Sequence, residues 1–342
     1  MKEKLVNAAL LIASLILALV AFEVGLRAYH GEWEYRNYRS PQDKFTGYHA
    51  YDAELGWVPK EQRGDSGGAP VTIVAGGIRS NGGEEVWDGN DEPNLAVGDS
   101  FTFGEFVPDS ETWPAQLEKL SGTRVINGGV DGYGVDQIFL RARRFLSRYR
   151  FSTVIFSFIP DDIRRSQMSV MFVTAKPYFD FKDGRLTLEN VPVPPTSHAR
   201  KESELLIALE HSRLVHTVMQ RLSPKWWLAP SEIQVQDREE GIKVACALLH
   251  ELEGLTKSRG SKLIVLAQHG EVENSWESMA SESVLTCLSD PATRVLDLKP
   301  ALSELKAKDP SRYHRLFYSD GHMTADGNQF VALEIAKILT RR

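Results

Sequence analysis

Two short motifs, far apart in the chain, carry residue types that can do nucleophilic chemistry together. Gly98-Asp99-Ser100 follows the apolar run Asn94-Leu95-Ala96-Val97, which predicts a strand that ends in a tight turn. Asp320-Gly321-His322 stands near the C-terminal end. A serine hydroxyl needs a base to take its proton and a third group to orient that base. Ser100, His322 and Asp320 therefore predict a catalytic triad.

Each of these residues also has a plainer interpretation. Ser100 could cap the segment that follows it, and His322 could be a surface loop histidine. The strand before Ser100 and the aspartate two residues before His322 favour the catalytic interpretation. The chain has nine histidines, and the others lack this context.

Further blocks of sequence resemble the SGNH (GDSL-type) hydrolases. Residues 97–104 are similar to the family's first block, 127–134 to its second and 320–322 to its last. The resemblance covers about residues 91–163 and 236–342. It implies acyl transfer through Ser100, with the backbone N–H of Gly132 in the oxyanion hole.

One position departs from the family pattern. The third block of the family reads Gly-x-Asn-Asp, whereas this chain reads Ile159-Pro160-Asp161-Asp162, so Asp161 stands at the oxyanion asparagine. An ionised carboxylate has no N–H to donate and repels developing negative charge. Three outcomes stay open. Asp161 is protonated by burial near other carboxylates, or it points away and leaves the N–H groups of Ser100 and Gly132, or the domain is weak or inert.

The first thirty residues differ in composition from the rest. Lys2 and Lys4 precede an apolar run from Leu5 to Phe22, which is near the roughly 17–20 residues that span a bilayer as a helix. The long run and the poor cleavage site at residues 19–21 favour an uncleaved signal anchor over a cleaved signal peptide, which stays open. A basic N-terminus that remains in the cytoplasm places the catalytic domain in the periplasm or outside the cell.

Two upstream motifs resemble a membrane-anchored bacterial subgroup of the family. They are Asp52-Ala53-Glu54-Leu55-Gly56-Trp57 and Ser80-Asn81-Gly82. The resemblance implies acyl groups, often acetyl, on cell-envelope or exported polysaccharide. Water as acceptor makes an esterase and a sugar hydroxyl makes an O-acyltransferase, and both stay open. A membrane acyl-donor or a polysaccharide-export protein is the implied partner. The alternative is a weak or inactive glycan-binding or envelope-assembly protein.

The elements that position these residues predict an α/β fold. Apolar runs that read as strands alternate with helical patterns, the strands at 94–97, 124–127, 153–158, 262–267 and 294–297. The helices are expected at 112–117, 135–149, 237–258 and 326–340. This alternation predicts a central parallel sheet covered on both faces by helices. The resemblance implies that this is the three-layer α/β/α sandwich of SGNH hydrolases, which is flavodoxin-like. Ser100, Gly132 and Asp161 each follow a strand, and active sites of such sheets lie at that edge.

The expected organisation has three parts. Residues 1–30 form the transmembrane helix, 31–90 an irregular lead-in packed on the domain, and 91–342 the SGNH hydrolase-like domain. A cap insertion at about 164–235 contains a hairpin at 177–188 and an amphipathic helix at 203–222. For Trp226-Trp227, packing inside the cap is preferred over sugar stacking or a place at the membrane interface.

Composition narrows the partners. Forty basic and 46 acidic residues give a formal charge of -6, which gives no electrostatic case for nucleic acid. The expected substrate is an acylated carbohydrate or a small ester, with no cofactor, and no Cys/His spacing suggests a metal. Cys246 lies in a helical pattern, so a buried thiol is preferred over a disulfide with Cys287, which stays open.

Overall fold

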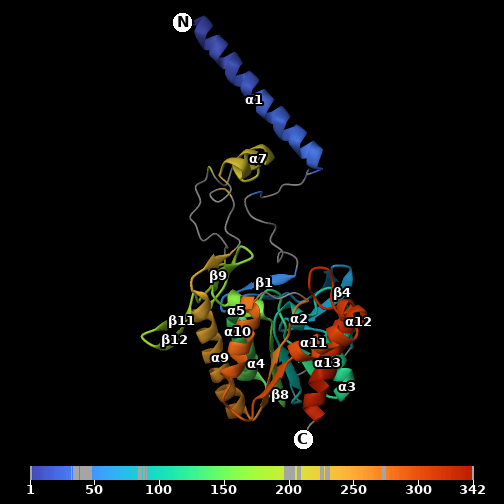
Figure 1. Ribbon diagram of the computed structural model, residues 1–342. Coiled ribbons are helices and arrows are strands. Elements are labelled where there is room, and N and C mark those ends of the chain that lie inside the picture. The colour runs from blue at the N-terminus through green and yellow to red at the C-terminus, as the bar shows by residue number, and fades with distance from the viewer. Residues whose placement is uncertain are drawn as a thin grey trace. The chain divides into compact units, whose positions relative to one another are not determined.

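The computed structural model describes residues 2–31, 33, 38, 48–83, 87, 89, 91–195, 205, 209–223, 227, 232–271 and 275–340. The chain divides into two compact units (Figure 1). The anchor unit comprises Met1–Lys44, Phe172–Thr174 and Thr196–Ile233. The sheet unit comprises Phe45–Met171, Ala175–Pro195 and Gln234–Arg342. The predicted cap at about 164–235 is therefore divided. Its residues 172–174 and 196–233 belong to the anchor unit, and the rest belong to the sheet unit.

Within the described residues, the sheet unit is built on an eight-stranded sheet. In spatial order its strands are β15 (Arg294–Asp297), β14 (Lys262–Ala267), β8 (Thr153–Phe158), β6 (Asn94–Val97), β7 (Val125–Asn127), β5 (Ile78–Arg79), β4 (Ala69–Val74) and β3 (Gln62–Ser66). The first five run parallel, in the order of flavodoxin-like folds. The predicted strands and the α/β class are confirmed.

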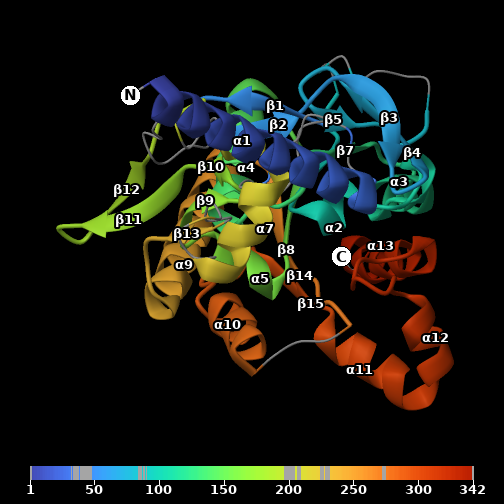
Figure 2. The same ribbon diagram turned by 90° about the horizontal axis from the view of Figure 1, so that it is seen from above.

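Helices cover both faces of this sheet (Figure 2). α3 (Trp113–Ser121) packs with α13 (Ala325–Thr340), and α4 (Val135–Arg148) packs with α9 (Arg238–Arg259) on the opposite face. Shorter helices are α2 (Ser100–Phe103), η1 (Asp109–Glu111), α5 (Pro160–Arg165), α10 (Ser275–Thr286), α11 (Lys299–Lys308) and α12 (Pro310–Arg315). Every residue of β6 and β8 is buried, as expected for strands covered on both faces.

The lead-in is a correction to the prediction, because residues 48–79 are largely strands rather than irregular. β1 (His49–Asp52) and β2 (Gly56–Pro59) form a hairpin. β5, β4 and β3 continue the central sheet in antiparallel fashion, joined to β7 where Arg79 pairs with Asn127. The sheet is therefore mixed, and only its central part is parallel. β3 is a polar, largely exposed edge strand, so it lacks the apolar pattern that reveals a strand in sequence.

The insertion contains the predicted hairpin, formed by β11 (Tyr178–Lys182) and β12 (Arg185–Glu189). Short strands β9 (Met168–Met171), β10 (Thr174–Ala175) and β13 (Ile233–Gln234) stand on either side of it in the chain. The predicted helix at 203–222 is described as α7 (Arg213–Leu222), with part of the earlier segment outside the described residues.

The cysteines correct a second preference. Cys246 on α9 and Cys287 after α10 form a disulfide with a Cα–Cα distance of 5.8 Å. The bridge ties α9 to the loop after α10. The sequence pattern around Cys246 indicates only its helical setting, and the neighbour that makes pairing feasible comes from the packing of α10 against α9.

In the anchor unit, α1 (Lys2–His30) is long and apolar enough to cross a membrane. A signal sequence near an N-terminus meets the same test. None of its described side chains is buried.

The turn between β1 and β2 is fixed by one carboxylate, and this gives a testable expectation. Asp52 accepts the N–H groups of Glu54 and Leu55 and a two-point pair from Arg144 of α4, at 2.7 Å for each nitrogen. Partial burial opposes ionisation, but the Arg144 pair and the two N–H groups outweigh it and lower the pKa of Asp52 from 3.8 to about 2.

We expect Asp52→Asn to lower the free energy of unfolding by about 1–2 kcal/mol at pH 7. Because the folded-state pKa is lowered, this stabilisation is present above pH 3.8 and is lost as pH falls toward 2. Urea denaturation in detergent, followed by tryptophan fluorescence, measures it. The control is Glu54→Gln, which alters the exposed arm of the same Arg144 pair and should cost under about 0.5 kcal/mol. A difference that persists unchanged at pH 2 contradicts the assignment.

Candidate active site

The structure brings the three predicted triad residues together. Ser100 begins α2 directly after β6, and His322 lies on the loop before α13. Ser100 Oγ is 3.0 Å from His322 Nε2, and His322 Nδ1 is 3.1 Å from Asp320 Oδ2. With the proton of the neutral imidazole on Nδ1, facing Asp320, Nε2 is free to accept the Ser100 hydroxyl proton. The geometry is that of a nucleophile, a base and an orienting carboxylate.

Close backbone packing fixes the turn that presents Ser100. A Cβ at Gly98 would lie 2.1 Å from Thr102 Oγ1, and one at Gly129 would lie 2.3 Å from the Phe103 nitrogen. Both positions therefore exclude any side chain. Asp99 caps α2 by accepting the Phe101 N–H at 3.0 Å and so supports the turn.

Gly132 lies on the loop after β7, with φ +73°, a conformation that favours glycine. Among the described residues its N–H donates to no acceptor, so it remains available to a ligand. Trp57 Nε1 donates to the Asp131 carbonyl at 3.0 Å, and the Tyr133 hydroxyl donates to the Trp57 carbonyl at 2.5 Å. These two bonds hold the peptide that carries the Gly132 N–H. Asn127 accepts the Gly129 N–H at 3.1 Å, which gives it a structural role in the same loop.

The Asp52–Trp57 motif resembles the anchored subgroup, but its residue types indicate no chemistry of their own. The structure gives the motif a role, because Trp57 supports the oxyanion loop and Gln137 Nε2 donates to the Leu55 carbonyl at 2.8 Å. The motif therefore links α4 to the loop that carries Gly132. The sequence does show Trp57 directly after a turn motif, which could have marked it as a structural residue. Its contact with the Gly132 loop is visible only in the fold.

Asp161 is engaged by two arginines of its own helix, α5. Arg164 Nε lies 2.6 Å from Asp161 Oδ1, and Arg165 Nε lies 2.9 Å from Oδ2. Burial opposes ionisation, but these two guanidinium groups outweigh it and lower the pKa of Asp161 below its usual range. The protonated form considered from sequence is therefore wrong. As a donor, Asp161 supplies nothing, and the N–H groups of Ser100 and Gly132 remain.

Arg165 also reaches the other carboxylates beneath the Ser100 turn. Its Nη1 lies 2.8 Å from Asp162 Oδ1 and 3.5 Å from Asp99 Oδ2. Burial and the charge of Asp99 raise the pKa of Asp162 well above the usual range, against the opposing effect of Arg165. Burial likewise raises the pKa of Asp99. Within the described ranges, no group of three or more His, Cys, Asp or Glu side chains is arranged to hold a metal ion.

Glu105 is a site residue that sequence reasoning missed. Its Oε2 lies 3.3 Å from His322 Nε2, the same nitrogen that faces Ser100. Burial and the Glu105 charge raise the pKa of the nearby Asp131 carboxyl well above the usual range. Nothing in the local sequence marks Glu105. Its carboxylate reaches the histidine through the left-handed turn at Gly104, φ +83°, and the left-handed Phe106, φ +68°.

Two aromatic rings border the histidine. The Phe101 and Phe106 ring centroids each lie 5.3 Å from that of His322, tilted and edge-on respectively. Together with Glu105, they surround the His322 ring with two apolar faces and one carboxylate.

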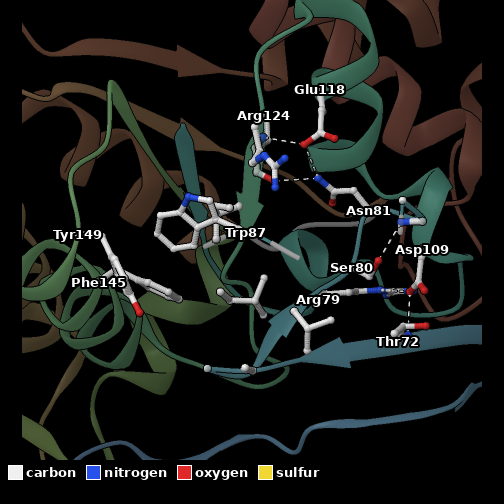
Figure 3. Close-up of a pocket in the computed structure, with 18 of the residues that line it drawn as sticks. Thr72, Arg79, Ser80, Asn81, Trp87, Asp109, Glu118, Arg124, Phe145 and Tyr149 are labelled. Atoms are coloured by element: carbon white, nitrogen blue, oxygen red, sulfur yellow. Dashed lines mark hydrogen bonds and ion pairs between the residues drawn. The ribbon is translucent and has the colours of Figure 1, made fainter. Parts of the chain in front are cut away.

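A cavity of about 910 Å³ in the sheet unit lies elsewhere and does not include the triad (Figure 3). It is bounded by β4, β5, α3 and α4, with Trp87 and Tyr149 side by side at ring centroids 4.5 Å apart. Several polar side chains that line the cavity form hydrogen bonds with one another. Asn81 of the Ser-Asn-Gly motif bonds Glu118 at 2.9 Å and the Val125 carbonyl at 2.7 Å.

Arg79 connects this cavity to the catalytic turn. Its buried guanidinium pairs with Asp109 and donates to the carbonyls of Phe103, Gly104 and Val107. Burial lowers the pKa of Arg79 against the opposing charge of Asp109. The carbonyls lie on α2 and the loop that follows it, so Arg79 fixes the backbone on both sides of Glu105.

No family model matches the chain, and no curated protein matches it. Solved structures do resemble it. A lipolytic protein of the G-D-S-L family from Desulfitobacterium hafniense DCB-2 has 14% sequence identity and a TM-score of 0.42, covering 72% of this chain and 99% of that one. A catalytic mutant of Axe2, an acetylxylan esterase from Geobacillus stearothermophilus, has 13% identity and a TM-score of 0.44, covering 75% and 98%. TesA has 13% identity and a TM-score of 0.41, covering 73% and 98%.

The class of the protein rests on its own geometry. A flavodoxin-like α/β sheet carries a Ser-His-Asp arrangement at the carboxyl end of its strands. A glycine N–H with no acceptor among the described residues lies on the neighbouring loop. This is an arrangement suited to serine-based acyl transfer.

Proposed function

We propose that the chain is an extracytoplasmic SGNH-type serine esterase or O-acyltransferase, held in the membrane by α1. Its expected substrates carry acyl groups, in the first place acetyl, on cell-envelope or exported polysaccharide. The observation that carries the chemistry is the 3.0 Å approach of Ser100 Oγ to His322 Nε2, with Asp320 on the other ring nitrogen. The polysaccharide target rests on the sequence resemblance of Asp52–Trp57 and residues 80–82 to anchored relatives.

In the proposed reaction, His322 Nε2 takes the Ser100 proton as Oγ attacks the acyl carbonyl carbon. Asp320 stabilises the imidazolium that forms. The carbonyl oxygen becomes an oxyanion that accepts the N–H groups of Ser100 and Gly132. His322 then returns the proton to the leaving alcohol oxygen, and an acyl-serine remains. In the second half of the reaction, His322 Nε2 takes the proton of an acceptor hydroxyl, from water or a sugar, whose oxygen attacks the acyl-serine carbonyl carbon. The Ser100–acyl bond breaks, and His322 returns the proton to Ser100 Oγ.

The non-catalytic alternative, a glycan-binding or envelope-assembly protein, is favoured by one observation. Asp161 is an ionised carboxylate where the family has a donor. Against it, the triad distances are those of an active arrangement. Ser100 and His322 are brought together from opposite ends of the domain, which a binding role does not require.

Triad variants test the catalytic assignment. We expect Ser100→Ala and His322→Ala each to lower the kcat for p-nitrophenyl acetate by about 1,000-fold or more, and the double variant to be no worse than either. The reason is that serine and histidine act as one unit. Circular dichroism checks that the variants fold. An additive loss, or wild-type protein with no activity on varied acyl esters, would favour the binding-protein alternative.

Asp161 provides a second test. Asp161→Asn should raise kcat/KM on acetyl esters by up to about 100-fold, because it restores an oxyanion donor and removes a negative charge. Asp161→Ala is the matched control, since it removes the charge without supplying a donor and should gain less. The lowered pKa keeps Asp161 ionised at neutral pH and above, so the gain should be the same at pH 6 and pH 9. Lower activity in Asp161→Asn would assign the carboxylate a positive role.

Fractionation tests the anchor. We expect the full chain to stay in alkaline carbonate-washed membranes, with its N-terminal sequence intact, because the Leu5–Phe22 run is long enough to span the bilayer. Protease added to spheroplasts should digest the sheet unit if it lies outside the cytoplasm. A soluble protein that begins near Phe22 would show a cleaved signal peptide instead.

A further inference from the structure

Helix α7 (Arg213–Leu222) exposes large apolar side chains, whereas a helix in a water-soluble unit normally buries them. At 100° per residue, one side carries the apolar residues, namely Leu214, Val215, Val218, Met219 and Leu222. Val218 is 43% exposed and Leu222 is 75% exposed. The buried residue of the helix is His216, on the polar side.

The polar side of α7 is the one that packs within the anchor unit. Trp227 Nε1 donates to His216 Nδ1 at 3.0 Å, and the Tyr38 ring lies 5.3 Å from the His216 ring. The Arg213 guanidinium lies over Tyr38. The inward packing includes these polar and aromatic contacts. On the apolar side, Leu214, Val215 and Met219 are half-buried, whereas Val218 and Leu222 are exposed. Trp227 itself is fully buried, as the packing interpretation expected, and Trp226 lies outside the described residues.

The start of α7 is fastened to the end of the membrane helix. Glu23 of α1 accepts the backbone N–H groups of Arg213 and Leu214 at 2.9 and 2.8 Å, and the Ser212 hydroxyl at 3.0 Å. Arg27 of α1 pairs with Glu23 at 2.6 Å and donates to the His211 carbonyl. A carboxylate that fills the first N–H groups of a helix is a strong cap.

The place of Glu23 in α1 sets the depth of this junction. It directly follows the apolar run Leu5–Phe22, whose helical length of about 27 Å is close to the ~30 Å hydrocarbon core. The first turn of α7 is therefore held at the boundary where the membrane helix leaves the bilayer.

We propose that α7 lies on the bilayer surface, with Val218 and Leu222 inserted among the lipids at the interface. Continuity with the membrane helix selects lipid as the occupant, because the cap at Glu23 leaves the apolar side of α7 beside the same bilayer. Arg221 borders the apolar side and can reach lipid phosphates with its long side chain. The inference rests on the proposed membrane anchor.

Site-directed labelling in the full chain tests this placement. Leu222→Cys and, as a matched control, Gln220→Cys carry the environment-sensitive dye NBD, in vesicles of phosphatidylcholine and phosphatidylglycerol. Both positions are exposed and two residues apart, on opposite sides of α7. Wild-type protein treated with the same dye checks that the Cys246–Cys287 disulfide does not react with it. We expect the Leu222 label to be blue-shifted, several-fold brighter than the Gln220 label, and quenched by a doxyl lipid labelled near the headgroup.

The outcomes separate this inference from the anchor itself. A Leu222 label that is quenched by aqueous iodide like the Gln220 label, in protein retained after a carbonate wash, overturns the inference and keeps the anchor. A blue-shifted label that doxyl lipid does not quench indicates cover by a second copy of the chain and overturns the lipid assignment. If the carbonate wash releases the protein, the proposed membrane anchor is refuted, and the placement of α7 that rests on it is refuted as well.

A second variant tests the cap. Glu23→Ala removes the acceptor for three donors at the start of α7. In the Leu222→Cys background we expect it to cut the NBD brightness by about half or more while the protein stays in the membrane. Unchanged brightness would show that Glu23 does not position α7 and would overturn that part of the inference.

Discussion

The sheet unit depends on how closely the backbone packs around the turn at Ser100. Gly98 and Gly129 leave no room for a β-carbon, so α2 lies directly on the strand ends and on the loop after β7. That contact brings the serine loop and the Gly132 loop together without any side chain between them. Once it is made, the Ser100 hydroxyl and the Gly132 N–H share one edge of the sheet.

The second constraint is electrostatic. Asp99, Asp131, Asp161, Asp162 and Glu105 crowd the same edge, and burial alone would force several of them to protonate. Arg165 reaches three of these carboxylates, and the charges of Asp162 and Asp161 raise its pKa against the opposing effect of partial burial. The Asp161 carboxylate is thus accommodated because α5 supplies its own counter-charges, Arg164 and Arg165. In the proposed reaction, the carboxylate has no N–H to offer to an oxyanion.

The parts that sequence revealed are those with local periodicity or local chemistry. The parallel strands, α4 and α9 were readable because their apolar residues repeat at the periods of buried strands and amphipathic helices. The triad was readable because serine, histidine and aspartate stand in short motifs beside those elements. The edge strands β3 and β5 were not, because β3 is polar and β5 has only two residues. β4 does alternate between buried and more exposed residues, and the prediction missed this pattern because glycine turns flank the strand.

Contacts between distant segments set the limits of sequence reasoning at the site. Glu105 meets His322 only because Gly104 and Phe106 adopt left-handed backbone, and no single-sequence pattern reports that. The arginines that ionise Asp161 stand three and four residues further along α5, a spacing that predicts side-chain pairing on a helix. The spacing of Arg164 and Arg165 from Asp161 therefore already argues against a protonated carboxyl.

The pairing of charged groups can be compared in the two units, each taken by itself. In the sheet unit, Asp99, Asp161 and Asp162 at the strand ends are paired with Arg165. In the anchor unit, the polar side of α7 is paired and its apolar side is not. Water penalises exposed apolar surface at about 25 cal/mol per Å², so a helix keeps such a face outward only where something apolar meets it. For a segment capped by Glu23 of the proposed membrane helix, the bilayer is the apolar phase within reach.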